Sequence, residues 1–315
     1  MEHHFLPQFY LRGFRDPEIP EDKGPWLWVT DCVEKTVLRR SPKAVGKKTD
    51  YYAFPEIEAA GGEGIEAIFS KLESAAAPVI KKLVASDDMP LEAQDRADLL
   101  YFMAFFVTRV PASRDPLENF AAEIAKMTLQ MSASRPDYFA ATLREALKAA
   151  GEDFDLTPEK IEEYRQFALD ESRYSITTSP KLSLGAGFKT ASDTIFPAFD
   201  RMRWAVVRAT GDARLVTSDR PVSWVDPTLA APFAFGLATR NVEVTFPLDP
   251  KTCVFGTWNG TQGAIKASDR ILEQLNVRAV GFADRYLFSH SEGAGRSALD
   301  LRMKGERRGA AKDTR

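Results

Sequence analysis

The spacing of apolar residues changes its period near Arg203, and this change limits the possible folds more than any other feature of the chain. Before this point, apolar residues recur every three to four positions, which is typical of amphipathic helices. After it, short runs alternate apolar and polar residues, which is typical of half-buried strands. A block of helices followed by a block of strands predicts an α+β fold rather than alternating βαβ units.

The same periodicity places the individual elements. Within the expected helix 92–108, residues 99–107 are apolar nearly all round, which is typical of a helix buried on several sides. We expect a helical middle section packed on a mostly antiparallel sheet from the C-terminal half, with a small strand pair within residues 26–40. The expected helices are 65–83, 92–108, 117–131, 138–150, 158–172 and 269–282, and the expected strands of the second half are 203–209, 213–219, 242–248, 253–258 and 285–290.

Composition and cysteine content narrow the possible classes of protein. A net charge of −3 with a pI near 5.8 gives no overall basic field, so any contact with nucleic acid needs a local cluster of Arg and Lys. Cys32 and Cys253 have no CxxC spacing, which argues against a disulfide framework and a thiolate zinc site and fits a reducing cytoplasm. We find neither a signal peptide nor a membrane span. We expect one domain over residues 1–302 and a disordered basic tail over 303–315.

The first fourteen residues, MEHHFLPQFYLRGF, join two of the three histidines to an aromatic and aliphatic anchor. Histidine titrates near neutral pH and is the commonest metal ligand, so His3 and His4 are candidate site residues. The alternative is a buried or capping His4 and an exposed His3, and we interpret His290 as structural. The side chains that we expect to be buried, holding His4 in a cleft with Asp219, are Pro7, Tyr10, Leu11 and Phe14.

Two pairs of charged residues lie on the expected helices. Glu66 and Glu73 are seven residues apart and share one edge of an apolar stripe, where they could supply oxygen ligands or a general base. Arg109 and Arg114 follow the apolar helix and could clamp an anion. The alternatives are a solvated stripe edge for the glutamates and, for the arginines, internal salt bridges to partners such as these glutamates.

The segment TSDRP, residues 217–221, ends an expected strand with two hydroxyls, a carboxylate and a proline. The end of a strand is a common place to present a catalytic acid, which makes Asp219 and Ser218 candidates. The alternative is a turn in which these two side chains bind nearby backbone. The GxGxxG, GxxxxGK[ST], GxSxG and HExxH motifs are absent, so the sequence gives no support to a dinucleotide, P-loop, serine-hydrolase or zincin site.

Several of these segments together resemble one known family, the bacterial proteins catalogued as domain of unknown function 4238. The match covers most of the chain in the same order, and it makes the N-terminal and TSDRP segments family features without assigning them an activity. The segments that carry the resemblance are residues 4–11 with Phe14, the glutamates at 66 and 73, Arg109–Pro111, Thr217–Val222, Phe246–Leu248 and Leu275–Asn276.

Our first functional hypothesis is a metal-dependent hydrolase of a phosphate-containing substrate, a phosphoesterase or nuclease acting on nucleic acid or a nucleotide. A divalent Mn, Fe, Zn or Mg ion would activate a bound water. The alternative is a non-enzymatic sensor or interaction module that binds an anionic ligand or a protein partner. The assigned roles are catalytic for His4 and Asp219, substrate-binding for Arg109, Arg114, Ser218 and Tyr10, and metal-binding for His3, His4, Glu66, Glu73 and Asp219.

Overall fold

The computed structural model describes residues 2–52, 64–86, 88, 91–152, 156–229 and 236–313, with side chains described up to residue 306. The chain forms two compact units, one of residues Met1–Ser113 with Leu184–Arg315 and one of residues Arg114–Ser183. The sequence predicts one domain over residues 1–302.

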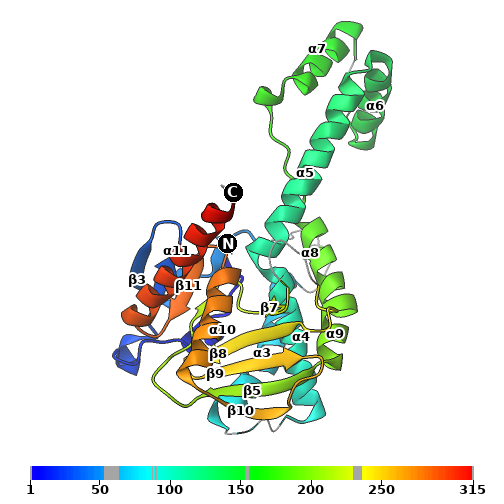
Figure 1. Ribbon diagram of the computed structural model, residues 1–315. Coiled ribbons are helices and arrows are strands. Elements are labelled where there is room, and N and C mark those ends of the chain that lie inside the picture. The colour runs from blue at the N-terminus through cyan, green and yellow to red at the C-terminus, as the bar shows by residue number, and fades with distance from the viewer. Residues whose placement is uncertain are drawn as a thin grey trace. The chain divides into compact units, whose positions relative to one another are not determined.

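A five-stranded sheet lies at the centre of the first unit, with its strands in the order β10-β5-β9-β8-β7. Neighbouring strands are antiparallel except for β10 and β5, which are parallel. Figure 1 shows β8, β9, β5 and β10 side by side. The bounds are β5 Arg203–Ala209, β7 Ser223–Val225, β8 Glu243–Asp249, β9 Thr252–Thr257 and β10 Gly263–Ala267.

Both faces of this sheet are covered by helices. Val206 and Val254 belong to the main apolar core, which includes the buried side of α3 (Ile65–Ala85) and α4 (Ala93–Arg109). Their neighbours Val207 and Cys253 face the other way and pack with α10 (Asp269–Phe282). The buried residues of α4 include the run from Phe102 to Phe106, so the expected central helix is confirmed.

A second sheet has the strand order β3-β2-β11-β6 and brings the N-terminal strand pair beside the end of the chain. The helix α11 (Glu292–Asp313) packs here, with Ala298 in a cluster that contains Val216 and Leu287. The described part of α11 reaches into the segment expected to be disordered. The strand bounds are β2 Leu27–Asp31, β3 Thr36–Arg40, β6 Thr217–Ser218 and β11 Tyr286–Ser289.

A short antiparallel pair, β1 (Glu2–His4) with β4 (Lys47–Thr49), fixes the start of the chain ahead of α1 (Gln8–Arg12). The N–H groups of Phe5 and Leu6 both donate to the Gly46 carbonyl, at 2.8 and 3.1 Å. Gly46 has a φ of +64°, and a Cβ built there would lie 2.7 Å from the Leu6 Cβ. Glycine is therefore required at this turn, both for its backbone conformation and for the close approach of Leu6.

The second unit is helical. It contains most of α5 (Pro111–Ala133), followed by α6 (Pro136–Ala149) and α7 (Pro158–Leu169). The predicted N-cap of α7 is confirmed, because the Thr157 hydroxyl accepts a bond from the Lys160 N–H at 3.4 Å. The core of this unit consists of Ala133, Phe139, Ile161 and Ala168, with partly buried side chains around them.

The structure is α+β, as the sequence predicts, and all the long expected helices are present. None of the described helices has both the length and the apolar character that crossing a membrane requires. The sequence did not reveal the shorter or more polar elements, which are β1, β4, β7, β10, α8 (Pro180–Thr190), α9 (Phe196–Arg201) and α11, together with the π-helix Ala191–Ile195 and the 3-10 turns Glu21–Lys23, Pro42–Ala44 and Glu171–Arg173.

Candidate functional site

The N-terminal segment, residues 2–14, forms a largely buried clasp that holds His4 in a fixed place. Pro7, Tyr10, Leu11 and Phe14 are buried, as the sequence predicts. The Tyr10 hydroxyl donates to the Pro247 carbonyl at 2.7 Å and shares a hydrogen bond of 2.6 Å with the Thr217 hydroxyl. Burial raises the pKa of Tyr10 well above its usual range. Tyr10 therefore links the clasp to β8 and to the TSDRP segment, and it lies too deep to meet a substrate.

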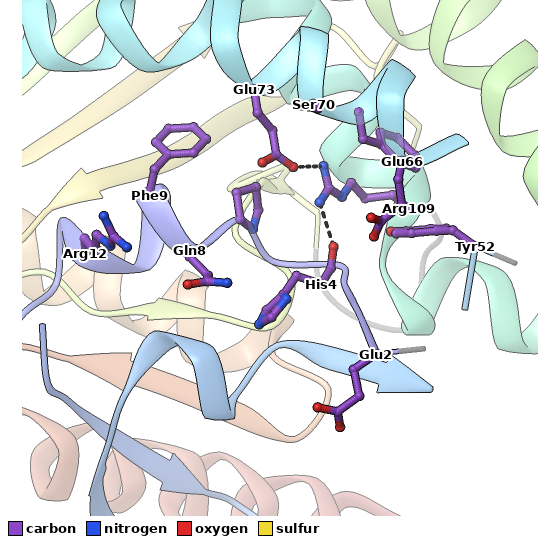
Figure 2. A pocket seen from close by; sticks show the side chains of 12 residues that line it. Glu2, His4, Gln8, Phe9, Arg12, Tyr52, Glu66, Ser70, Glu73 and Arg109 are labelled. Carbon is purple, nitrogen blue, oxygen red and sulfur yellow. Dashed lines mark hydrogen bonds and ion pairs between the residues drawn. The ribbon is translucent and has the colours of Figure 1, made fainter. Parts of the chain in front are cut away.

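His4 lines an open pocket of about 380 Å³ in the first unit. Three of the lining side chains, His4, Gln8 and Arg12, are four residues apart in the clasp. Four others come from the first part of α3, at helical spacing. Figure 2 shows the pocket. Its lining consists of Glu2, His4, Pro7, Gln8, Phe9, Arg12, Tyr52, Glu66, Phe69, Ser70, Glu73 and Arg109.

Arg109 joins the clasp to α3 at the base of this pocket. Its side chain is buried; Nη1 donates to Glu73 Oε1 at 2.9 Å and Nη2 donates to the His4 carbonyl at 3.0 Å. The guanidinium also lies over the Phe69 ring, 4.5 Å from its centroid. The internal salt bridge considered as the alternative for Arg109 is thus the arrangement found, with Glu73 as the partner.

His3 faces away from His4, as expected for neighbouring residues on a strand. Its Nδ1 accepts the Tyr52 N–H at 3.2 Å, its ring contacts the Tyr52 ring, and its Nε2 lies 4.0 Å from Glu66 Oε1. His3 is 4% exposed, so the alternative in which His3 is exposed is wrong. The reason is the pairing of β1 with β4, which covers it.

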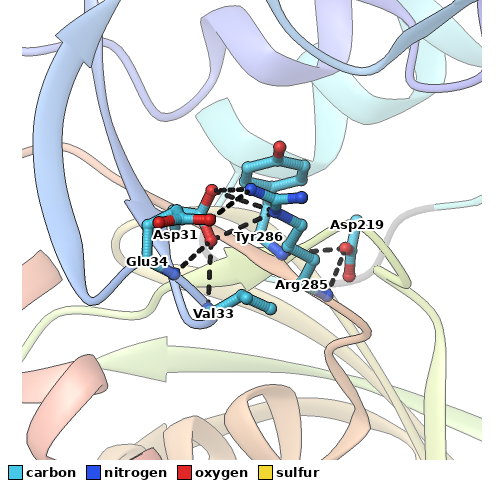
Figure 3. A network of polar contacts seen from close by, with 6 residues as sticks. All are labelled: Asp31, Val33, Glu34, Asp219, Arg285 and Tyr286. Atoms are coloured by element: carbon cyan, nitrogen blue, oxygen red, sulfur yellow. Dashed lines mark hydrogen bonds and ion pairs between the residues drawn. The ribbon is translucent and has the colours of Figure 1, made fainter.

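Asp219 is part of a structural network, shown in Figure 3. Its carboxylate accepts the backbone N–H groups of Asp284, Arg285 and Tyr286, at 2.9, 2.7 and 2.8 Å. Burial raises the pKa of the Asp219 carboxyl, while these backbone bonds act in the opposite direction. Ser218 is fully buried, and its Oγ accepts the Arg220 N–H at 3.1 Å, which is the local turn considered as an alternative for TSDRP.

The five predicted metal ligands do not come together. His4, Glu66 and Glu73 line the pocket, whereas Asp219 is absent from its lining and is occupied by backbone donors. Within the described ranges, no group of three His, Cys, Asp or Glu side chains is placed to hold a metal ion. The predicted set combined residues by type and order, and neither property determines which side chains converge.

Arg114 is in the second unit, where it is 1% exposed. Its Nε donates to the Ser183 hydroxyl at 3.1 Å and its Nη2 lies 3.2 Å from Glu118 Oε1. These contacts hold Arg114 inside its unit. As for Arg109, the structure shows the internal salt bridge that was the alternative to an anion clamp.

Among the polar side chains of the pocket that were not candidate site residues in the sequence are Gln8, Arg12 and Ser70. A signal for them was present. Gln8 and Arg12 follow His4 at intervals of four, and Ser70 lies between Glu66 and Glu73 at helical spacing.

His290 follows β11 and gives a testable pH dependence. Burial, followed by the positive charge of Arg214, lowers the pKa of its imidazole below 6.5. The unfolded chain therefore takes up this proton first, so the folded state loses stability as the pH falls below about 6.5. We expect the stability of His290→Gln, measured by urea unfolding between pH 7 and pH 5, to fall less than that of the parent. An equal fall in stability in both proteins would contradict the assignment of this pH dependence to His290.

These features define an α+β protein with a polar pocket formed by its N-terminal clasp and α3. The chain belongs to the family described as Protein of unknown function (DUF4238), which matches residues 2–293 and confirms the resemblance inferred from the sequence. Comparisons with curated proteins and with solved structures found no match.

Proposed function

We propose that the N-terminal pocket binds a phosphate-containing ligand that also carries hydrogen-bond donors, such as a nucleotide or the end of a nucleic acid strand. The observation that carries this proposal is the set of polar side chains that line one pocket, His4, Gln8 and Arg12 from the clasp and Glu66, Ser70 and Glu73 from α3. Pockets that bind small polar ligands combine a few such groups with apolar walls, here Phe9 and Phe69.

The charges inside the pocket separate into paired and available groups. Glu73 is paired with Arg109, and Glu2 with Lys47. Arg12 is exposed and has no ion pair within the described part of the chain, so its guanidinium is available for a phosphate. Glu66 has a side chain that is 55% exposed and can accept bonds from sugar hydroxyl or base amino groups.

A basic segment lies next to the pocket and supports an anionic ligand. Residues 35–49 contain six Lys or Arg and no acid. Because the chain as a whole has no basic field, contact with an anionic ligand requires a local cluster of this kind. In the β1–β4 pair, Lys47 lies opposite His4 and Lys48 opposite His3. Arg40 and Lys43 on the same segment are exposed. A ligand longer than one nucleotide would meet these cations as it leaves the pocket.

Binding can be tested by calorimetric titration with inorganic phosphate, a nucleoside monophosphate, a nucleoside triphosphate and a short single-stranded oligonucleotide. We expect at least one of the nucleotides or the oligonucleotide to bind. Arg12→Ala should weaken that binding about 10- to 100-fold, since a hydrogen bond to a charged group contributes about 1.5–3 kcal/mol. The matched control is Arg270→Ala, an exposed arginine on α10. No binding by the parent, or equal losses in both variants, would contradict the proposal.

A second candidate function is hydrolysis of a phosphoester in the same pocket by acid and base catalysis. It is favoured by His4, whose Nε2 is buried without a hydrogen-bond partner among the described residues, beside a pocket that also contains two carboxylates on α3. Imidazole and carboxylate groups together supply a general acid and a general base. If the bound ligand is turned over, His4→Gln should abolish product formation and leave binding largely intact. If the parent binds the ligand but forms no product, the hydrolysis is contradicted and the non-enzymatic binding function remains.

A further inference from the structure

An apolar stripe runs along α5 in the second unit. Phe120, Ile124, Met127 and Met131 are 65%, 47%, 57% and 70% exposed. Their spacing of four, three and four residues is that of the a and d positions of a coiled coil, and it places them on one side of the helix. Soluble proteins rarely expose contiguous apolar side chains of this size unless a partner covers them.

The rest of the second unit leaves this stripe uncovered. Its core is built by another face of α5, where Ala133 packs with Phe139 and Ile161. Polar contacts of α5 with the rest of the unit also lie off the stripe, from Lys126 to Glu171 and from Ser132 to Thr142. The helix therefore has one face committed to its own unit and another that presents only large apolar groups.

We propose that this stripe, residues Phe120 to Met131 of α5, pairs antiparallel with the same stripe of a second copy of the chain. A two-fold antiparallel pair places Phe120 against the partner's Met131 and Ile124 against the partner's Met127, so the stripe is complementary to itself. No further partner is needed to cover it.

The charge distribution along α5 favours the second copy and the antiparallel direction. Glu118 is paired with Arg114 and Lys126 with Glu171 inside the unit, which leaves the exposed Glu123 as the charge that flanks the stripe. An antiparallel pair keeps the two copies of Glu123 apart along the helix axis, whereas a parallel pair would set them at the same level, where their charges repel. The positions that flank the stripe are nearly uncharged, since they hold Ala121, Thr128 and Gln130 besides Glu123.

Sedimentation of the full chain over a range of concentrations tests the pairing. We expect a reversible dimer in the parent, and Phe120→Glu with Met127→Glu should weaken association about 100-fold or more, because charges would be buried without partners. The matched control adds the same charges at two exposed valines of the first unit, in Val33→Glu with Val277→Glu, and should still dimerise. A parent that stays monomeric at every concentration would overturn the proposal, as would equal weakening in both double variants.

Disulfide crosslinking tests the direction. Phe120→Cys and Met131→Cys, mixed as separate full-length variants, should crosslink to each other far more than either does to itself, because a disulfide requires Cα atoms within about 7 Å. The native thiols should not interfere: both are buried, and burial raises the pKa of Cys32 to about 11 and of Cys253 to about 12. Self-crosslinking of each variant would show parallel pairing and overturn the antiparallel arrangement.

Discussion

Replacement of Asp219 by alanine is expected to lower the free energy of unfolding by about 3 kcal/mol, since three part-buried backbone donors lose their acceptor and a buried donor without a partner costs about 1–3 kcal/mol. The Asp219 carboxylate accepts three consecutive backbone N–H groups, those of residues 284–286, at the start of β11. Without it, these donors lose their partner at a point where β6, β11 and β2 are joined. Urea unfolding measures the effect.

Two comparisons sharpen this prediction. Asp219→Asn keeps one acceptor oxygen but turns an amide group toward the backbone donors, so we expect a smaller but clear loss of stability. Asp212→Ala removes an exposed aspartate from a nearby turn and should change stability by less than about 0.5 kcal/mol. A fully stable Asp219→Ala protein with lost activity would instead support the catalytic role first predicted for this residue.

Replacement of Arg109 by methionine is expected to cost about 3 kcal/mol, because it removes one partner of a largely buried ion pair. The change leaves the Glu73 carboxylate and the His4 carbonyl without their donor. Glu73 is 26% exposed, so water offsets part of the loss. The measurement is again urea unfolding. Arg109, Glu73 and His4 also line the pocket, so this ion pair positions part of its wall.

A double-mutant cycle separates this ion pair from the packing of Arg109. Adding Glu73→Leu to Arg109→Met should recover about 1–2 kcal/mol, because no unpaired carboxylate remains. The control on the same helix is Arg96→Met, whose pair with Asp200 is more exposed and should contribute about 1 kcal/mol or less. Equal losses of unfolding free energy in Arg96→Met and Arg109→Met would contradict the central position of Arg109.

The long helices and the main strands were predictable because each element carries its own periodic pattern. Residues 102–106 of α4 show burial on all sides in the sequence alone. The pair β1 and β4 shows no such pattern, since its strands read EHH and KKT. These strands exist because tertiary contacts, including the bonds to the Gly46 carbonyl, bring the two segments together.

The candidate site was predictable in part. The clasp, and a salt bridge from Arg109 to a glutamate of α3, follow from burial and charge. The partners of Asp219 do not, because they lie 65 to 67 residues further along the chain and are backbone groups that any sequence would supply. The predicted link between the clasp and TSDRP exists, but Tyr10 and Thr217 form it rather than His4 and Asp219.

The most direct test of the central proposal, a ligand site at His4, is the NMR signal of its imidazole ring. The chain contains only three histidines, and His3→Gln and His290→Gln variants would assign their signals. During titration with the nucleotide or oligonucleotide that calorimetry shows to bind, we expect the His4 signal to shift in proportion to binding, while the signal of His290 stays unchanged. Unchanged signals from both histidines at saturating nucleotide, or a shift of His290 alone, would contradict the proposed site.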